Sequence, residues 1–230
     1  MKIKIVSNYQ SEELLSISKS FYDGLDIEKV YVNGSHGFYS FNFLNYVILN
    51  SDFQDIDLMV YIDEDCFIVD KNALLDLINY VINNNIDCIG MPDGGVIYHR
   101  AHNPVAINQF FCVLNLKRIR EKYDVNIVNS VRYTADLEKY TPYNKLKPGS
   151  TICYDDFEPY YKLFFWMLKN NFKIEYLDAN SFPGDTVTTI LKNQNGIDFA
   201  YHTWYARGWD NPNHRERIIN VINYCKAISK

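Results

Sequence analysis

The chain has 230 residues, of which 47% are hydrophobic and 22% are charged, and this balance excludes a wholly disordered protein. The formal net charge is −5, so the composition predicts no basic surface for nucleic-acid phosphates and no nucleic-acid partner. Aromatic residues make up 16% of the chain, including 19 Tyr and 14 Phe, which indicates either a tyrosine-rich core or a site walled with rings for sugars or nucleobases.

The N-terminal residues and the cysteines bear on where the protein works. The segment from Met1 to Val6 reads directly into a strand and lacks the apolar region and cleavage site of a signal peptide. No stretch approaches the roughly 20 apolar residues that span a bilayer. Five scattered cysteines without a C-x-x-C pair favour free thiols in a reducing compartment. We therefore expect a cytoplasmic protein without a transmembrane segment, and peripheral attachment to the inner face of a membrane stays open.

Strands and helices alternate along the first part of the chain. The expected strands are residues 2–7, 29–32, 57–62 and 87–90, and the helices between them are residues 11–21, 40–50 and 71–84. The later part contains a strand at 109–116, a helix at 155–170, short strands at 174–177 and 199–201, and a final helix at 214–227. Such alternation predicts an α/β fold with a mainly parallel central sheet and helices on both faces. Ligands bind to such sheets beyond the carboxyl ends of the strands.

Three consecutive acids, Asp63, Glu64 and Asp65, follow the apolar third strand. In an extended chain Asp63 and Asp65 point to one side, with Cα atoms roughly 6–7 Å apart. Like charges at this spacing repel each other, and a divalent cation would neutralise them. A solvated acidic loop or a set of helix caps is the structural alternative. An apolar strand of a parallel sheet delivers these carboxylates to the ligand-binding edge, which favours a metal site.

A second pair of acids, Asp155 and Asp156, lies at the expected start of the helix at 155–170. Asp155 and Glu158 have the spacing of a capping box, so we interpret Asp155 as the N-cap. Asp156 is not needed as a cap, and a carboxylate held at a helix start can act as a general base. Asp156 is therefore the better functional candidate of the two, although capping alone also explains the pair.

Polar and aromatic residues gather in two further segments. They are Asp93, Arg100, His102 and Asn108 after the fourth strand, and His202, Trp204 and Arg207 near the C-terminus. We interpret the first group as turn and loop residues, some of which face a substrate. The second group indicates either a histidine packed against rings in a core or a pocket wall that closes over an anion.

Taken in order, these segments resemble the GT-A class of nucleotide-sugar-dependent glycosyltransferases, and more closely its inverting, family-two-type members. Residues 60–67, Val-Tyr-Ile-Asp-Glu-Asp-Cys-Phe, resemble the D-x-D region of that class. Tyr154-Asp155-Asp156 and the helix after it resemble the E-D motif, and His202 is similar to a third metal ligand that occurs late in many members. The resemblance covers most of the chain, although each motif is short.

The resemblance implies an α/β, GT-A-type Rossmann-like fold with one glycosyltransferase domain over residues 1–230. Within it, residues 1–100 would bind the nucleotide sugar, and residues 101–230 would bind the acceptor and carry catalysis. The implied partners are a nucleotide-sugar donor and a glycan, lipid-linked or other hydroxyl acceptor. The implied reaction is metal-dependent transfer of a sugar to that hydroxyl with inversion.

The resemblance also implies roles for single residues. Asp63, Asp65 and His202 would hold Mn²⁺ or Mg²⁺ against the donor diphosphate, and Asp156 would take the proton of the acceptor hydroxyl. The residues expected to bind the donor are Asn8, Tyr9, Asn33, Asp63, Glu64, Asp65 and Arg207. The residues expected to bind the acceptor are Asp93, Arg100, His102, Asn108 and Trp204.

The sequence departs from the family-two pattern in three places. Residues 40–42, Ser-Phe-Asn, stand where an Ala-Arg-Asn run is common, so a phosphate-facing arginine is missing there and Arg207 is expected to replace it. The first acid of the E-D pair is Asp155. No Q-x-x-R-W motif is present, which argues against a processive synthase. A retaining enzyme of the same fold, and a non-catalytic carbohydrate- or nucleotide-binding domain, stay as alternatives. A sugar-nucleotide pyrophosphorylase is disfavoured because residues 7–10 form no Gly-rich, Arg-containing loop.

Overall fold

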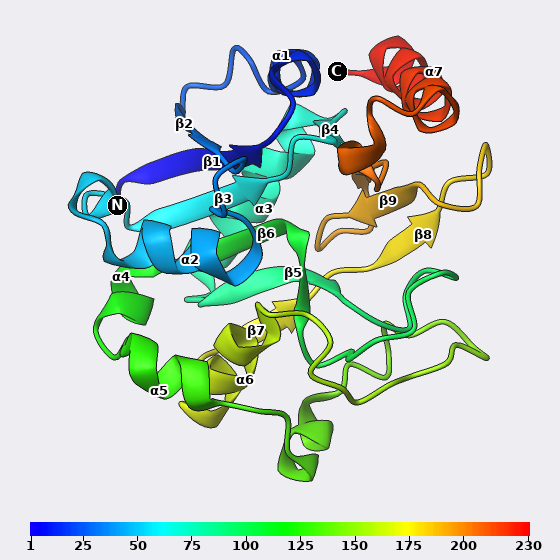
Figure 1. Cartoon of the computed structure of the whole chain (residues 1–230). Coiled ribbons are helices and arrows are strands. Elements are labelled where there is room, and N and C mark those ends of the chain that lie inside the picture. Colours follow the sequence, from blue (N-terminus) through cyan, green and yellow to red (C-terminus); the bar gives the residue numbers. More distant parts are fainter.

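The computed structural model describes all 230 residues and contains a six-stranded central sheet of order β2-β1-β3-β6-β5-β7 (Figure 1). Its strands are β1 (Ile3–Tyr9), β2 (Glu28–Asn33), β3 (Leu58–Ile62), β5 (Cys88–Pro92), β6 (Ile107–Asn115) and β7 (Ile174–Tyr176). Neighbouring pairs are parallel except at β6, which runs antiparallel to both β3 and β5. The mainly parallel sheet predicted from the sequence is therefore confirmed.

Seven helices accompany the sheet. They are α1 (Glu12–Ser20), α2 (Ser40–Leu49), α3 (Lys71–Asn83), α4 (Leu116–Arg120), α5 (Val125–Ser130), α6 (Tyr161–Lys169) and α7 (Pro212–Ile228). Short 3-10 turns lie at η1 (Ser51–Phe53), η2 (Ala135–Tyr140) and η3 (Ala206–Gly208). Polar N-caps start several of the helices: Ser11 accepts from the amide of Leu14 at 3.2 Å, and Asp70 accepts from that of Ala73 at 3.0 Å. No helix is both long and apolar enough to cross a membrane.

The two faces of the central sheet bury two separate apolar cores. All of β3 is buried, and its successive side chains alternate between the cores, with Val60 in one and Tyr61 in the other. The Val60 core is covered by α1, α3 and α7, and the Tyr61 core by α2, α4 and α6. Figure 1 shows α2 in front of the sheet and α3 behind it. Helices on both faces, as the sequence predicts, follow from strands that are apolar on both sides.

A smaller antiparallel sheet of order β4-β10-β9-β8 lies beside the first. Its strands are β4 (Cys66–Ile68), β8 (Ala179–Ser181), β9 (Thr189–Lys192) and β10 (Asp198–His202). In the pairing of β4 with β10, His202 stands opposite Cys66, the residue directly after the acidic triplet. This register brings the late histidine to the end of β3.

The predicted start of the helix at 155–170 is wrong, because α6 begins at Tyr161. Residues 152–157 have no regular structure, and Asp155 is not an N-cap. Pro159 gives the physical reason: its ring disfavours the helical conformation at the preceding residue, Glu158. Proline itself is compatible with the first turn of a helix, so the helix starts just after it.

Candidate functional site

The acidic triplet forms the turn between β3 and β4, at the carboxyl edge of the central sheet. The amide of Asp63 donates to the carbonyl of Phe110 at 2.9 Å, and the amide of Cys66 donates to the carbonyl of Asp63 at 3.1 Å. The amide of Thr203 donates to the carbonyl of Asp65 at 3.0 Å. The turn is therefore held by backbone bonds to β6 on one side and to the end of β10 on the other.

Asp63, Asp65 and His202 each offer a ligand atom, and these three atoms lie within 4.8 Å of one another. His202 Nε2 is 3.1 Å from Asp65 Oδ1, and both side chains are buried. His202 Nδ1 is buried without a hydrogen-bond partner. Phe110 stacks on the imidazole with a centroid distance of 4.2 Å and an interplanar angle of 6°, which fixes the plane of the ring. Two carboxylates and one imidazole suit Mn²⁺, and the carboxylates also suit Mg²⁺.

The pKa values of the two aspartates shift in opposite directions although they share one site. Burial, followed by the charges of Asp65 and Glu64, raises the pKa of Asp63 well above its ordinary value. Burial alone would also raise the pKa of Asp65, but the imidazole of His202 and the hydroxyl of Thr203 outweigh burial and lower the pKa. A bound divalent cation would relieve the repulsion that Asp63 experiences.

Glu64 points away from the other two acids and holds the start of α1. Its Oε2 accepts from the amides of Gln10 at 3.0 Å and Ser11 at 2.8 Å. Burial raises the pKa of Glu64 to about 7, although these two amide bonds act against the rise. Its carboxylate therefore stands just before α1, next to the helix N-terminus where Rossmann-like folds often bind a phosphate.

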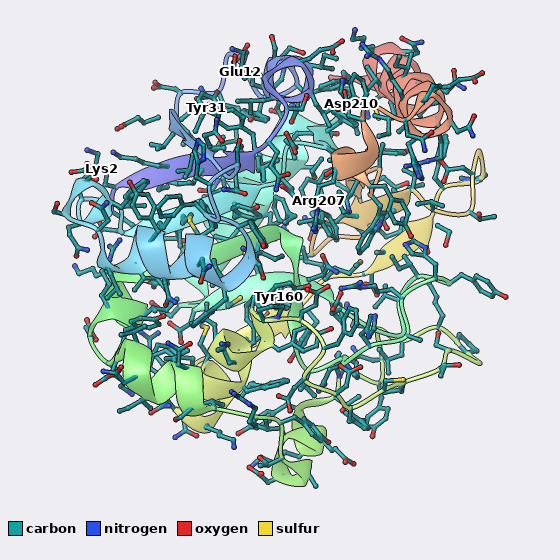
Figure 2. The ribbon with its side chains drawn as sticks, in the orientation of Figure 1. Lys2, Glu12, Tyr31, Tyr160, Arg207 and Asp210 are labelled. Atoms are coloured by element: carbon teal, nitrogen blue, oxygen red, sulfur yellow. The ribbon has the colours of Figure 1, made fainter.

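A cavity of about 470 Å³ opens in front of the acidic turn. The residues predicted from the sequence that line it are Asn8, Asp63, Glu64, Asp65, Arg100, Asn108, His202, Trp204 and Arg207. Figure 2 labels two lining residues, Arg207 before α7 and Tyr160 before α6, which both lie near the middle of the molecule despite their separation in the chain. The cavity thus gathers residues from both halves of the chain at one sheet edge.

A buried ion pair forms the wall that faces the turn. Arg100 Nε and Nη2 donate to the two carboxylate oxygens of Asp93 at 2.8 and 3.0 Å, and Nη2 also donates to Glu158 at 2.7 Å. Asp93 is fully buried and also accepts from Asn108 and Tyr161. Asp93 thus anchors Arg100 from the interior side of the cavity wall. Glu158 keeps 24% of its side chain exposed and is itself a lining residue.

Five residues predicted for the site do not line this cavity: Tyr9, Asn33, Asp93, His102 and Asp156. Asn33 accepts from the amide of Ser35 at 2.8 Å in its own turn. The exposed carboxylate of Asp156 accepts from the amide of Tyr133 at 2.9 Å. These two side chains support local loop structure.

The sequence reasoning missed several lining residues, chiefly Glu158, Phe110 and Tyr160. Phe110 lies near the start of β6. Because β6 runs antiparallel to β3, this start lies beside the carboxyl end of β3. An antiparallel assignment for residues 107–115 would have identified this position. The capping-box spacing predicts Glu158 inside the helix, whereas the Glu-Pro pair indicates an extended residue before the helix.

Neither the protein-family models nor the curated proteins give a match to this chain. Among solved structures, the chain is similar to A197 from STIV, with 13% identity and a TM-score of 0.46 over 86% of this chain and 96% of that one. It is also similar to a glycosyltransferase involved in the glycosylation of the major capsid of PBCV-1, with 14% identity and a TM-score of 0.37 over 63% of this chain and 69% of that one. Because both TM-scores are below 0.5, we base the function on the residues of the cavity.

Proposed function

We propose that this protein is a metal-dependent glycosyltransferase that moves a sugar from a nucleoside-diphosphate donor to an acceptor hydroxyl with inversion. The observation that carries the proposal is the placement of two carboxylates and one imidazole on one wall of the cavity, with a fourth acid, Glu158, on the wall that holds Arg100. Inverting transfer from a diphosphate donor is accelerated by a cation that stabilises the leaving group and by a base that takes the proton of the acceptor.

The residues present fit Mn²⁺ or Mg²⁺. The imidazole of His202 is oriented by Phe110 and leaves Nδ1 buried and unpaired, while repulsion from its acidic neighbours contributes to the raised pKa of Asp63. The imidazole nitrogen that faces Asp65 is Nε2, and the crowded carboxylates favour a cation between them. When bound, the ion would stabilise the negative charge of the leaving diphosphate. Asp63, Asp65 and His202 would hold it.

We expect the donor to bind between the end of β1 and the segment that follows β10. Asn8 lines the cavity with its side-chain amide fixed by the carbonyl of Phe38 at 2.6 Å, which leaves its position rigid. Arg207 lies exposed at the rim and is free to donate to phosphate oxygens. Because the carboxylate of Glu64 stands just before α1 and would repel a phosphate there, the diphosphate would depend on Arg207 and the metal rather than on that helix.

We assign the base role to Glu158 in place of Asp156, because Glu158 lines the cavity and Asp156 does not. In the proposed step the carboxylate of Glu158 takes the proton of the acceptor hydroxyl while the oxygen of that hydroxyl bonds to the anomeric carbon. The bond from that carbon to the phosphate oxygen breaks, and the electron pair leaves with the nucleoside diphosphate. Arg100 holds Glu158 at 2.7 Å and so fixes the direction of the carboxylate.

Thermal unfolding with a panel of nucleoside diphosphates and nucleotide sugars tests the proposal, with Mn²⁺ or with EDTA. A ligand that binds only the native state raises the midpoint, and we expect a rise that needs the metal. A flat panel in Mn²⁺ would contradict donor binding. With the donor known, release of nucleoside diphosphate separates an enzyme from a binding domain. The anomeric configuration of the product, read by NMR, separates inversion from retention.

A further inference from the structure

Phe157 is an exposed aromatic residue with unusually firm support. Its side chain is 61% exposed, and the imidazole of His102 stacks on one face at 4.2 Å with an angle of 11°. His102 Nδ1 lies 3.2 Å from Asp155 Oδ2, and the buried side chain of Asn103 donates to the carbonyl of Asp155 at 3.0 Å. One face of the ring is therefore braced from the interior while much of the residue remains open to solvent.

Phe157 is also the outer end of a continuous row of rings and cations that begins at the metal site. Trp204 lies 4.6 Å from His202, the Arg100 guanidinium lies 5.2 Å from the Trp204 ring, and it lies 5.9 Å from the Phe157 ring. We call Trp204, Arg100 and Phe157 the aromatic ledge. Phe157 does not itself line the cavity, but Arg100 of the ledge donates to Glu158 at 2.7 Å, so the ledge runs from the cavity, past the side chain assigned as base, to Phe157 outside it.

We propose that the aromatic ledge is an acceptor subsite for a saccharide of at least two units, with the reacting sugar beside Trp204 and Glu158 and the next sugar on Phe157. This inference rests on the proposed glycosyl transfer and adds the acceptor class. The C–H face of a pyranose packs on a flat ring, and its hydroxyl edge needs donors and acceptors beside that ring.

The groups around Phe157 meet both needs. The exposed part of its ring offers the apolar surface. His102 stacks on the ring, the Arg100 guanidinium lies 5.9 Å from the ring centroid, and Arg100 holds Glu158, so three groups that can hydrogen-bond to hydroxyls are close by. An acyl chain laid along the ledge would instead strip water from Arg100 and Glu158 without replacing their hydrogen bonds. The alternation of rings with charged groups therefore favours a polyhydroxylated ligand over a lipid chain.

Saturation-transfer NMR tests binding directly, with methyl cellobioside, methyl lactoside, methyl maltoside and methyl mannobioside as probes. We expect at least one to receive saturation from the wild type, and expect the signal to be lost in Phe157→Leu and kept in Phe157→Tyr. Tyr143→Leu, a change at another exposed ring that belongs to no part of the aromatic ledge, is the matched control and should keep the signal. Equal unfolding midpoints would show that the variants fold.

Transfer kinetics supply the second readout. We expect kcat/KM for the binding disaccharide to exceed that for its methyl monosaccharide by about tenfold, the worth of one favourable ring contact, and expect Phe157→Leu to remove the difference through KM. The assignment would be overturned if no disaccharide probe received saturation, or if Phe157→Leu bound the probe as well as the wild type does. It would also be overturned if nucleosides bound to the ledge in preference to the disaccharides. Phe157-dependent saccharide binding without any metal-dependent nucleotide binding would instead keep the ledge and refute the proposed transfer.

Discussion

At the residue scale, four acidic side chains of the site contact different partners. Asp63 and Asp65 face the imidazole of His202, Glu64 turns back to hold the start of α1, and Glu158 stands on the Arg100 wall. Each carboxylate has a different set of partners. Single substitutions therefore have separable expected effects.

Asp65→Asn removes a charge that a metal would need and that His202 is paired with. We expect transfer to fall by more than the roughly 10- to 100-fold that loss of an outer metal partner costs. We also expect the Mn²⁺-dependent rise in unfolding midpoint to vanish. The measurements are steady-state rates and thermal unfolding across Mn²⁺ concentrations. Asp178→Asn, at a surface pair with Lys145, is the control and should behave as the wild type. An unchanged response of Asp65→Asn to Mn²⁺ would exclude Asp65 as a ligand.

Glu158→Gln and Asp156→Asn give opposite expectations. Glu158→Gln keeps the size of the side chain but cannot accept the proton, so kcat should fall by about 10²- to 10⁴-fold while the donor KM changes little. Asp156→Asn should leave kcat within about twofold, because its carboxylate contacts the amide of Tyr133 and lies outside the cavity. Rates measured at saturating donor decide between them. A large loss in Asp156→Asn with normal Glu158→Gln would restore the assignment predicted from the sequence.

At the element scale, one arginine joins α2, η1 and the approach to β3. The Arg120 guanidinium donates to four carbonyls: those of Val47 at 3.2 Å, Ile48 at 3.0 Å, Phe53 at 2.8 Å and Ile56 at 2.7 Å. Two of these carbonyls belong to the last turn of α2, where helical partners are missing and a cation is favourable. Arg120 thus closes a stretch that would otherwise leave several acceptors unpaired.

Arg120→Met should lower the free energy of unfolding by about 2–4 kcal/mol, since part-buried carbonyls lose a charged donor and each unsatisfied group costs roughly 1–3 kcal/mol. Arg132→Met, at an exposed arginine, should change it by less than about 0.5 kcal/mol. Urea denaturation followed by circular dichroism measures both. A loss below about 1 kcal/mol for Arg120→Met would show that water replaces the guanidinium.

Helices and strands with a regular apolar pattern can be predicted from the sequence, whereas short strands that form only by pairing with a neighbouring strand cannot. Four of the five strands of the first 92 residues, all but β4, and the three helices lie close to their predicted positions, because their apolar patterns are long and punctuated by caps. The strands β8 and β9 are only three and four residues long, and their extended conformation depends on hydrogen bonds to neighbouring strands. The cluster of Asp63, Asp65 and His202 was predictable because each residue stands at or just after the end of a strand. The position of Glu158 was not predictable, because it depends on the path of the irregular segment that precedes α6.

At the scale of the whole molecule, the two ends of the chain close one core together. Trp209, just before α7, is buried and donates through Nε1 to Glu13 of α1 at 3.0 Å. Arg215 of α7 donates to the same carboxylate at 2.6 Å and lies 4.7 Å from the Trp209 ring. Figure 1 shows α1 and α7 adjacent at the same end of the molecule.

Trp209→Ala should cost about 3–5 kcal/mol of stability because it opens a cavity between α1 and α7. Trp209→Phe should cost less because it keeps a ring in the core. Glu13→Gln should cost under about 1 kcal/mol, because its pair with Arg215 is solvent-exposed. Urea unfolding ranks the three variants. Equal losses for Trp209→Ala and Glu13→Gln would show that the hydrogen bond, not the packing, holds the chain ends.

The antiparallel strand β6 has a consequence for synthesis on the ribosome. It lies between β3 and β5, yet both of these strands emerge from the ribosome before it. Until residues 107–115 are available, β3 and β5 cannot be joined, and the apolar inner edge of β3 stays unpaired. Unpaired apolar strand edges are templates for aggregation. A nascent chain that stalls between β5 and β6 would therefore need chaperone protection, and fragments that end in this interval should be insoluble.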